Sequence, residues 1–152
     1  MINKKLFTLV AFLFLLNCGY QPIFSSNQSI FSISNIELTE NNNVNSKLRN
    51  ALSIYTKNQN TKKFYDLKIS SKISKSILSK NSKGDAKILS LALSIKISVI
   101  ENNYLKNERT FLKTVSYDNN NNKFELKQYE NKIASNLTNK IIEEVIIHLQ
   151  SL

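Results

Sequence analysis

The stretch LSLALSIKISV, residues 89–99, decides the fold of this chain of 152 residues. Apolar side chains occupy six consecutive alternate positions in it, at Leu89, Leu91, Leu93, Ile95, Ile97 and Val99. Serine, alanine and lysine fill the positions between them. Because neighbouring side chains of a strand point to opposite faces of a sheet, this alternation predicts a strand with one apolar and one polar face.

Two further strands are expected on either side of this one. Upstream, one face of the predicted strand carries apolar residues, namely Tyr65, Leu67, Ile69, Ile73 and Ile77. Downstream, Phe111, Val115 and Tyr117 alternate, and Lys113 interrupts the pattern. The segments KNSKGDAK (80–87) and ENNYLKNE (101–108) are polar and predict the connecting turns. The three strands form a β-meander with one apolar face.

The segments outside the meander predict one more strand and two helices. In IFSISNIEL (30–38) the apolar alternation shifts phase after Ile33, which indicates a bulge. From Asn43 the apolar residues follow helical spacing for about four turns, and the preceding asparagines are candidate N-caps. After a polar loop at 118–123, a long helix carries an apolar stripe at Tyr129, Ile133, Leu137, Ile141, Val145 and Leu149.

A sheet with one apolar face and two helices with one apolar stripe each bury these surfaces together when the helices cover the sheet. The sequence therefore predicts an α+β fold of two layers. It consists of a four-stranded, mostly antiparallel sheet covered on one face by two helices, in the order β-α-β-β-β-α.

The N-terminus has the layout of a bacterial secretion signal. Lys4 and Lys5 precede an apolar run from Leu6 to Leu16. As a helix, this run spans about 16 Å, against about 30 Å for the hydrocarbon core of a bilayer. It is therefore too short for a transmembrane helix.

The chain has a single cysteine, Cys18, directly after this run. The residues Leu15-Leu16-Asn17-Cys18 resemble the lipobox of bacterial lipoproteins, although Asn17 stands where a small residue is usual. The resemblance implies cleavage before Cys18 and acylation of its thiol and of the new amino terminus, which gives a stable anchor. The expected organisation is a signal peptide at 1–17, a lipidated tether at 18–29 and one domain at 30–152. The alternative is an uncleaved hydrophobic N-terminus with a buried free thiol.

The chain is basic, with a formal net charge of +10 at neutral pH. A basic surface favours anionic partners. Export argues against nucleic acid and favours the headgroups of anionic lipids or glycolipids. The same charge is also typical of a chain enriched in lysine by biased composition, and this interpretation stays open.

The sequence offers little for catalysis. His148 is the only histidine, and its place beside the apolar stripe of the last helix indicates a surface or half-buried residue. With Cys18 acylated, neither a Cys/His pair nor a Ser/His/Asp triad has credible members, and a zinc cluster lacks ligands. Glu143 and Glu144 are neighbours on a helix, so their side chains point about 100° apart and do not form a catalytic pair. We expect a protein that is not an enzyme, with no cofactor and no metal.

Two polar regions are candidate binding sites. Lys80, Lys83 and Lys87 crowd one predicted turn, and Lys106 and Arg109 lie at the other end of the same strands. Such cations bind phosphates, although cations in turns are also often only solvated. The second region is the polar sheet face, which faces either water or a polar cavity such as the lumen of a β-barrel. Its members are Lys68, Ser70, Lys72, Ser74, Ser90, Ser94, Lys96 and Ser98.

Two motifs resemble a known family. The segment CGYQPIF (18–24) is similar to the opening of the lipopolysaccharide-assembly lipoprotein family LptE, of alphaproteobacterial type. The match consists of Cys18, Gly19, Tyr20, Pro22 and Phe24. The segment YENKIASNLTNKIIEEVIIHL (129–149) is similar to the closing helix of the family, and the predicted order of elements agrees with it.

The resemblance implies a lipid-anchored protein of the outer membrane that faces the periplasm. Such a protein plugs the large β-barrel LptD, helps it assemble, and helps deliver lipopolysaccharide to the cell surface. Lipopolysaccharide and the barrel are then the expected partners, with Lys80, Lys83, Lys87, Lys106 and Arg109 as possible lipopolysaccharide-binding residues. The alternative function is a membrane-anchored lipid-binding or transporter-auxiliary lipoprotein without a barrel partner.

Overall fold

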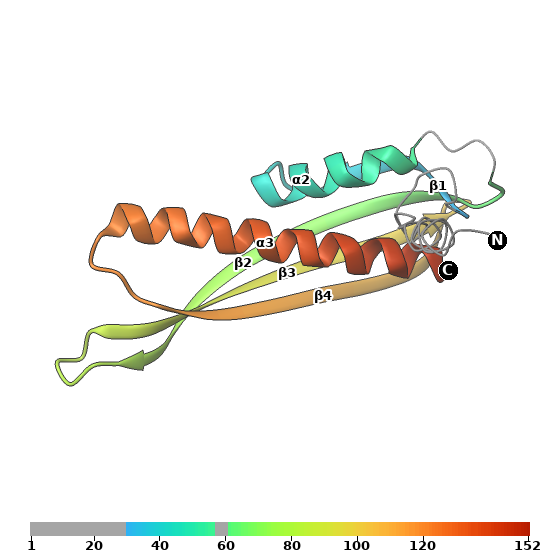
Figure 1. Ribbon diagram of the computed structural model, residues 1–152. Helices are drawn as coiled ribbons and strands as arrows, with labels where there is room; N and C mark the ends of the chain where they lie inside the picture. Colours follow the sequence, from blue (N-terminus) through green and yellow to red (C-terminus); the bar gives the residue numbers. More distant parts are fainter. Residues whose placement is uncertain (1–29, 57–60) are drawn as a thin grey trace, which may run out of the picture.

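The computed structural model describes residues 30–56 and 61–152. Its elements are β1 (Ser32–Leu38), α2 (Asn43–Leu52), the short 3₁₀ helix η2 (Ser53–Tyr55), β2 (Phe64–Lys80), β3 (Ala86–Glu101), β4 (Tyr104–Asp118) and α3 (Lys123–Gln150). The strands form one sheet in the order β1-β2-β3-β4, and Figure 1 shows α2 and α3 on the same side of it. The predicted two-layer α+β fold is confirmed.

The core lies between the sheet and the helices, and the alternation in β3 builds its centre. Leu91, Leu93, Ile95, Ile97 and Val99 are all buried. The antiparallel register places Leu67 opposite Val99 and Ile69 opposite Ile97. On the other side of β3, Phe111 of β4 lies opposite Ile95. Burial of each such side chain contributes about 1.5–3 kcal/mol, so this row stabilises the sheet and fixes its apolar face.

The first strand pairs with β2 in parallel, and its register shifts between Ile33 and Asn35. This irregularity is the bulge that the change of phase predicts. The bulge adds one residue to β1. Because of this extra residue, the apolar side chains before and after the bulge all face the helices.

Asparagine side chains begin both helices. The side chain of Asn42 accepts a hydrogen bond from the Asn45 N–H at 2.9 Å, as expected for an N-cap. Asn122 caps α3 in the same way through the N–H groups of Phe124 and Glu125. The first helix is shorter than the predicted four turns, because it tightens into η2 after Leu52.

The connection between β3 and β4 is much shorter than the predicted turn at 101–108. Only Asn102 and Asn103 form it, with φ angles of 52° and 66°, and β4 already begins at Tyr104. Both φ values lie in the left-handed region, which asparagine tolerates better than most residues and which suits a two-residue hairpin turn. The first part of β4 lies at the edge of the sheet and is mostly polar. For this reason the sequence pattern indicated a turn there and not a strand.

The long apolar stripe of α3 needs one correction at its beginning. Tyr129 is 52% exposed, whereas Glu130, only 6% exposed, takes the buried position four residues after Leu126. The rest of the stripe is buried as predicted, from Ile133 to Leu149. No helix in the described part of the chain is long and apolar enough to cross a bilayer.

Candidate functional site

The face of the sheet turned away from the helices, which we name the open sheet face, is rich in hydroxyl groups. The register brings Ser70, Ser74, Ser94 and Ser98 from β2 and β3 onto this face, as predicted. The structure adds hydroxyl-bearing residues of β4, because Thr110, Thr114 and Ser116 lie opposite Lys96, Ala92 and Ser90. The open sheet face is therefore a wide surface of hydrogen-bonding groups with few bulky apolar side chains.

Two lysines of the open sheet face are neutralised by carboxylates. Lys68 pairs with Glu37 of β1 at 3.2 Å, and Lys96 pairs with Glu108 of β4 at 2.8 Å. The hydrogen bond from Lys96 and a second one from Ser98 lower the pKa of Glu108. Lys72 has no ion-pair partner within 4.0 Å among residues 30–56 and 61–152. It leaves this face with a local positive charge.

The hairpin tip between β2 and β3 presents the first group of predicted cationic residues. Asn81 organises the turn, because its side-chain oxygen accepts hydrogen bonds from the N–H groups of Lys83 and Asp85, each at 2.9 Å. Gly84 allows the turn with a φ of +88°. Lys80, Lys83 and Lys87 are all exposed and form no ion pair with another described residue. Their charges are available to a ligand.

The second group of predicted cationic residues lies at the far end of the sheet, near the β3–β4 turn. Lys106 donates a hydrogen bond to Glu101 at 2.8 Å and lies 5.0 Å from the centroid of the Tyr65 ring. The bond to Glu101 raises the pKa of Lys106. The Arg109 guanidinium lies 5.1 Å from the centroid of the Phe111 ring. The structure therefore does not gather the five cations into one site, and it gives Lys106 and Arg109 internal partners.

His148 is half-buried at the end of α3, as expected. Its Nδ1 lies 3.3 Å from Nη1 of Arg109, and its Nε2 lies 2.9 Å from Oδ1 of Asn107. Arginine only donates, so Nδ1 accepts and the proton sits on Nε2, which donates to Asn107. Burial and the nearby charge of Arg109 lower the pKa of His148. The histidine is a neutral contact between α3 and β4.

A polar network between α3 and the sheet, with Tyr117 and Glu130 buried in it, was not predicted. Tyr117 of β4 donates a hydrogen bond to Glu130 at 2.7 Å, and Lys75 of β2 forms an ion pair with the other carboxylate oxygen. Burial would raise the pKa of Glu130, but the bonds from Lys75 and Tyr117 outweigh it and lower the pKa. The sequence did contain a sign of this network. Lys75 and Glu130 each stand at a position where the apolar pattern of their strand or helix calls for a hydrophobic residue, and they carry opposite charges.

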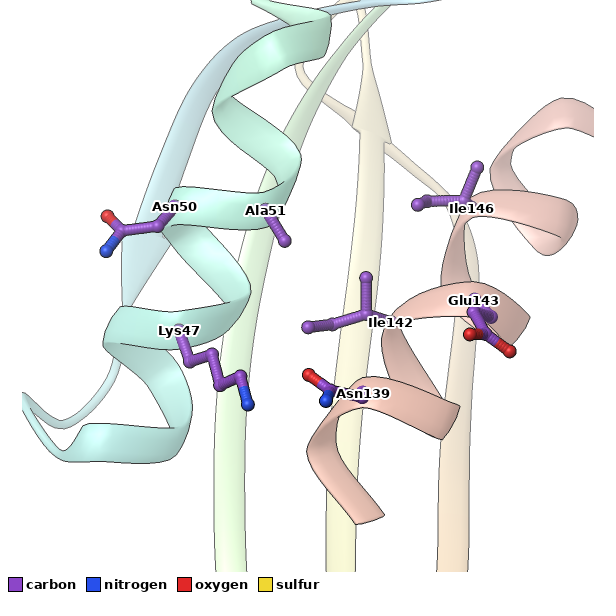
Figure 2. Close-up of a pocket in the computed structure, with 7 residues that line it drawn as sticks. All are labelled: Lys47, Asn50, Ala51, Asn139, Ile142, Glu143 and Ile146. Atoms are coloured by element: carbon purple, nitrogen blue, oxygen red, sulfur yellow. The ribbon is translucent and has the colours of Figure 1, made fainter. Parts of the chain in front are cut away.

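A groove separates α2 from α3 and was not predicted. Lys47 of α2 crosses it and donates hydrogen bonds to the carbonyl and hydroxyl oxygens of Ser135 in α3, at 3.2 and 2.6 Å. One hollow of about 510 Å³ lies along the helices, and Figure 2 shows Ala51 and Ile142 pointing into it. A second hollow of about 800 Å³ lies between the start of α2, α3 and the middle of β2.

The neighbouring acidic residues Glu143 and Glu144 have separate surroundings. Glu144 pairs with Lys113, the residue that interrupts the apolar pattern of β4, and Glu143 lines the smaller hollow. Within the part of the chain that the structure describes, no group of three or more His, Cys, Asp or Glu side chains is placed to hold a metal ion. Cys18 and the predicted signal and tether lie outside the described residues.

Comparison with known proteins gives matches to solved structures. No protein-family model and no curated protein sequence matches the chain. The uncharacterized lipoprotein B of Nitrosomonas europaea matches with a TM-score of 0.65 and 14% identity, over 88% of this chain and 91% of that one. A minor lipoprotein of Acinetobacter baumannii matches with a TM-score of 0.54 and 17% identity, over 77% of this chain and 91% of that one. This chain therefore shares its fold with these two lipoproteins.

Proposed function

We propose that this protein is an outer-membrane lipoprotein, anchored through Cys18 and facing the periplasm, that plugs and helps assemble an LptD-like β-barrel for lipopolysaccharide transport. The open sheet face carries this proposal. A surface enclosed in a polar lumen needs many hydrogen-bonding groups and few apolar ones, and the lumen of large barrels is polar. The role requires no catalytic group, cofactor or metal.

The dimensions of the domain suit this role. The longest strand, β2, has 17 residues, which at about 3.3 Å per residue corresponds to about 55 Å. The apolar band of an outer-membrane barrel is about 25 Å tall, so a sheet of this length reaches through it. Barrels of 26 strands and more exist, and a domain of this size has a radius of gyration near 14 Å.

The lipid anchor is supported by the lipobox-like residues before Cys18 and by the shared fold with proteins named as lipoproteins. Several acyl chains hold a protein at a membrane, because each buried CH₂ contributes about 0.8 kcal/mol. The tether at 18–29 would place the domain close to this membrane.

For lipopolysaccharide contacts, the hairpin tip is the stronger candidate. Lys80, Lys83 and Lys87 lack internal ion-pair partners in the described chain, and ammonium groups bind phosphate well. Lys106 and Arg109 would first have to leave Glu101 and His148, so we assign them a secondary role.

Co-purification in detergent tests the barrel partner. Ser94→Tyr places a bulky ring in the middle of the open sheet face, and Asn136→Tyr places the same ring on the outer surface of α3. We expect the first variant to lose the barrel protein and the second to retain it. Recovery of the unmodified protein without any barrel protein would contradict the proposal, as would equal retention by both variants.

Membrane fractionation with mass spectrometry tests the anchor. Cys18→Ala is expected to leave the mature protein without acyl mass and to release it from the membrane fraction. Asn17→Gly keeps the cysteine and is expected to retain both the acyl mass and the membrane association. Unchanged mass and partitioning of Cys18→Ala would refute the lipoprotein assignment.

One observation favours the alternative, a lipid-binding or transporter-auxiliary lipoprotein without a barrel. The groove between α2 and α3 lies on the side of the molecule away from the open sheet face and has a partly apolar lining that includes Ala51, Ile142 and Ile146. Deletion of the gene separates the two functions. Loss of surface lipopolysaccharide supports the barrel plug, whereas a defect in nutrient uptake with normal lipopolysaccharide supports the alternative.

A further inference from the structure

The second half of β2 is an edge of the sheet. Pairing with β1 ends where Leu38 lies opposite Ile69, and the Thr39 N–H still donates to the Ile69 carbonyl at 3.0 Å. Beyond that point β2 continues to Lys80 and pairs only with β3 among the described elements. Figure 1 shows this part of the hairpin running past the start of α2 and beyond the helices.

The backbone groups along this edge point outwards in a regular series. The Ile69 carbonyl faces the side of β1, since it bonds to Thr39. Backbone groups of alternate residues in a strand face the same side, so those of Ile73, Lys75 and Ile77 face the open edge. A row of such unpaired N–H and C=O groups is a template for an added strand.

Two apolar side chains at this edge, Ile73 and Ile77, are exposed. Ile73 and Ile77 share the helix-facing side with the buried Leu67 and Ile69, yet they are 43% and 52% exposed. The hollow of about 800 Å³ lies beside Ile73, with Ser71 and Ile73 on one wall and Ala134 and Thr138 of α3 on another. An added strand would cover Ile73 and direct alternate side chains towards this hollow.

The opposite edge of the sheet, formed by β4, carries more charge on its helix-facing side. Its helix-facing positions include Arg109 and Lys113, which contact His148 and Glu144 of α3. Inward-pointing charges are a common protection of edge strands against pairing. Along β2 the same side carries one such charge, Lys75, which pairs with Glu130 of α3, and the exposed, apolar Ile73 and Ile77 lie on either side of it.

We propose that the edge of β2 from Ile73 to Ile77 binds an extended, acidic segment of another protein as an added strand. Alternate apolar residues of the segment would cover Ile73 and Ile77. Its acidic residues would lie on the opposite face, near Lys72 and towards Lys80 and Lys83. The chain carries a net charge of +10, so pairing of this edge with a second copy would bring lysines together. This interface does not depend on lipopolysaccharide or on a barrel.

The test uses full-length protein in detergent and a synthetic extended peptide of about seven residues with alternating valine and glutamate. Calorimetry measures the affinity, and a peptide N-methylated at alternate amides serves as a probe that cannot form the ladder. Ile73→Pro removes an outward N–H and leaves the bonds to β3 intact. Leu112→Pro is the matched control. Backbone groups of successive residues face opposite sides of a strand, and the pairing of β2 with β3 and of β3 with β4 therefore places the Leu112 N–H at the outer edge of β4.

We expect the unmodified protein and Leu112→Pro to bind the peptide equally, and Ile73→Pro to bind it at least about tenfold more weakly. The N-methylated peptide is expected not to bind. Ile77→Asp, with Leu112→Asp as control, gives the same comparison without a change of backbone if the proline variant does not fold. Absence of peptide binding to the unmodified protein, equal losses in each matched pair, or a dimer that Ile73→Pro abolishes would overturn the proposal.

Discussion

Glu130 is the residue that ties the beginning of α3 to two strands at once. Its carboxylate is buried and bound by Lys75 of β2 and Tyr117 of β4, so all three groups depend on one another. Removing a partner of the buried carboxylate is costly, because it leaves a polar group without a hydrogen bond in a poorly solvated place. We expect this network to fix how α3 lies across the sheet.

Removing one donor tests the network. Tyr117→Phe should lower the free energy of unfolding by about 1–2 kcal/mol, because a buried carboxylate oxygen loses its hydrogen bond. Urea denaturation measures this change. Tyr129→Phe is the control, since Tyr129 is half exposed, and should change the stability by less than about 0.5 kcal/mol. Equal effects of the two substitutions would show that the network contributes nothing specific.

His148 predicts a dependence of stability on pH. Burial and Arg109 lower its pKa in the folded state below the ordinary value of 6.5. The folded state therefore binds fewer protons than the unfolded state as the pH falls through this region. The stability from neutral His148 is complete above pH 6.5 and is lost as the pH falls towards the lower pKa of the folded state.

The single histidine makes this prediction easy to measure. One imidazole signal is expected in a nuclear magnetic resonance titration, with a midpoint below that of an unfolded reference peptide. Arg109→Gln removes the nearby positive charge and should move the midpoint upwards, whereas Arg49→Gln, which changes a charge on α2, should not. An unshifted midpoint in the unmodified protein would contradict the buried, neutral histidine.

At the scale of elements, the turns determine how far the strands run. Asn102 and Asn103 close the β3–β4 hairpin in two residues, both in the left-handed region. This tight closure lets β4 start at Tyr104 and pair with β3 almost to its end. Asn42 and Asn122 then set where the helices begin. Asparagine serves both purposes, because its short amide bonds to nearby backbone and tolerates positive φ.

The turn gives a prediction with opposite signs for two substitutions. Asn103→Ala should lower the free energy of unfolding by about 1 kcal/mol, since alanine adopts a positive φ at a cost. Asn103→Gly should preserve or slightly raise the stability, because glycine has no Cβ to clash. Thermal denaturation of both variants measures the difference. If the asparagine side chain and not the backbone conformation mattered, the two variants would be equally unstable.

At the scale of the whole molecule, the sheet is longer than its helical cover. The core sits under α2 and α3, and the β2–β3 hairpin continues beyond them, as Figure 1 shows. Leu78 is 58% exposed there, whereas Leu93, near the middle of β3, is fully buried. The molecule therefore consists of a packed body and a projecting, basic hairpin. The hairpin lysines Lys80, Lys83 and Lys87 are exposed on this projection.

This division predicts uneven protection of backbone amides. Amides near the hairpin tip, at 76–90, should exchange with deuterium faster than those at 93–99, because few apolar contacts oppose local opening of the tip. Hydrogen exchange followed by mass spectrometry measures both segments in one experiment. Equal protection of the two segments would mean that the hairpin is as stable as the body.

The sequence by itself determined the order of the strands and helices and the way they stack, although not where β4 begins or where α2 ends. The alternation from Leu89 to Val99 and the spacing from Ile133 to Leu149 are local patterns, and each has one geometry that buries its apolar side. The bulge in β1 was also readable, because a period of two cannot change phase without an extra residue. The same local patterns gave the polar sheet face and the basic hairpin.

Only the tertiary structure decided which polar groups are free and which are already bound. Lys106 and Lys80 look alike in the sequence, but Lys106 lies against Glu101 and Tyr65, whereas Lys80 meets no carboxylate among the described residues. Glu130 and the open edge of β2 likewise depend on where β1 ends and where α3 lies. These are contacts between distant segments, which register and packing set and which no local period encodes.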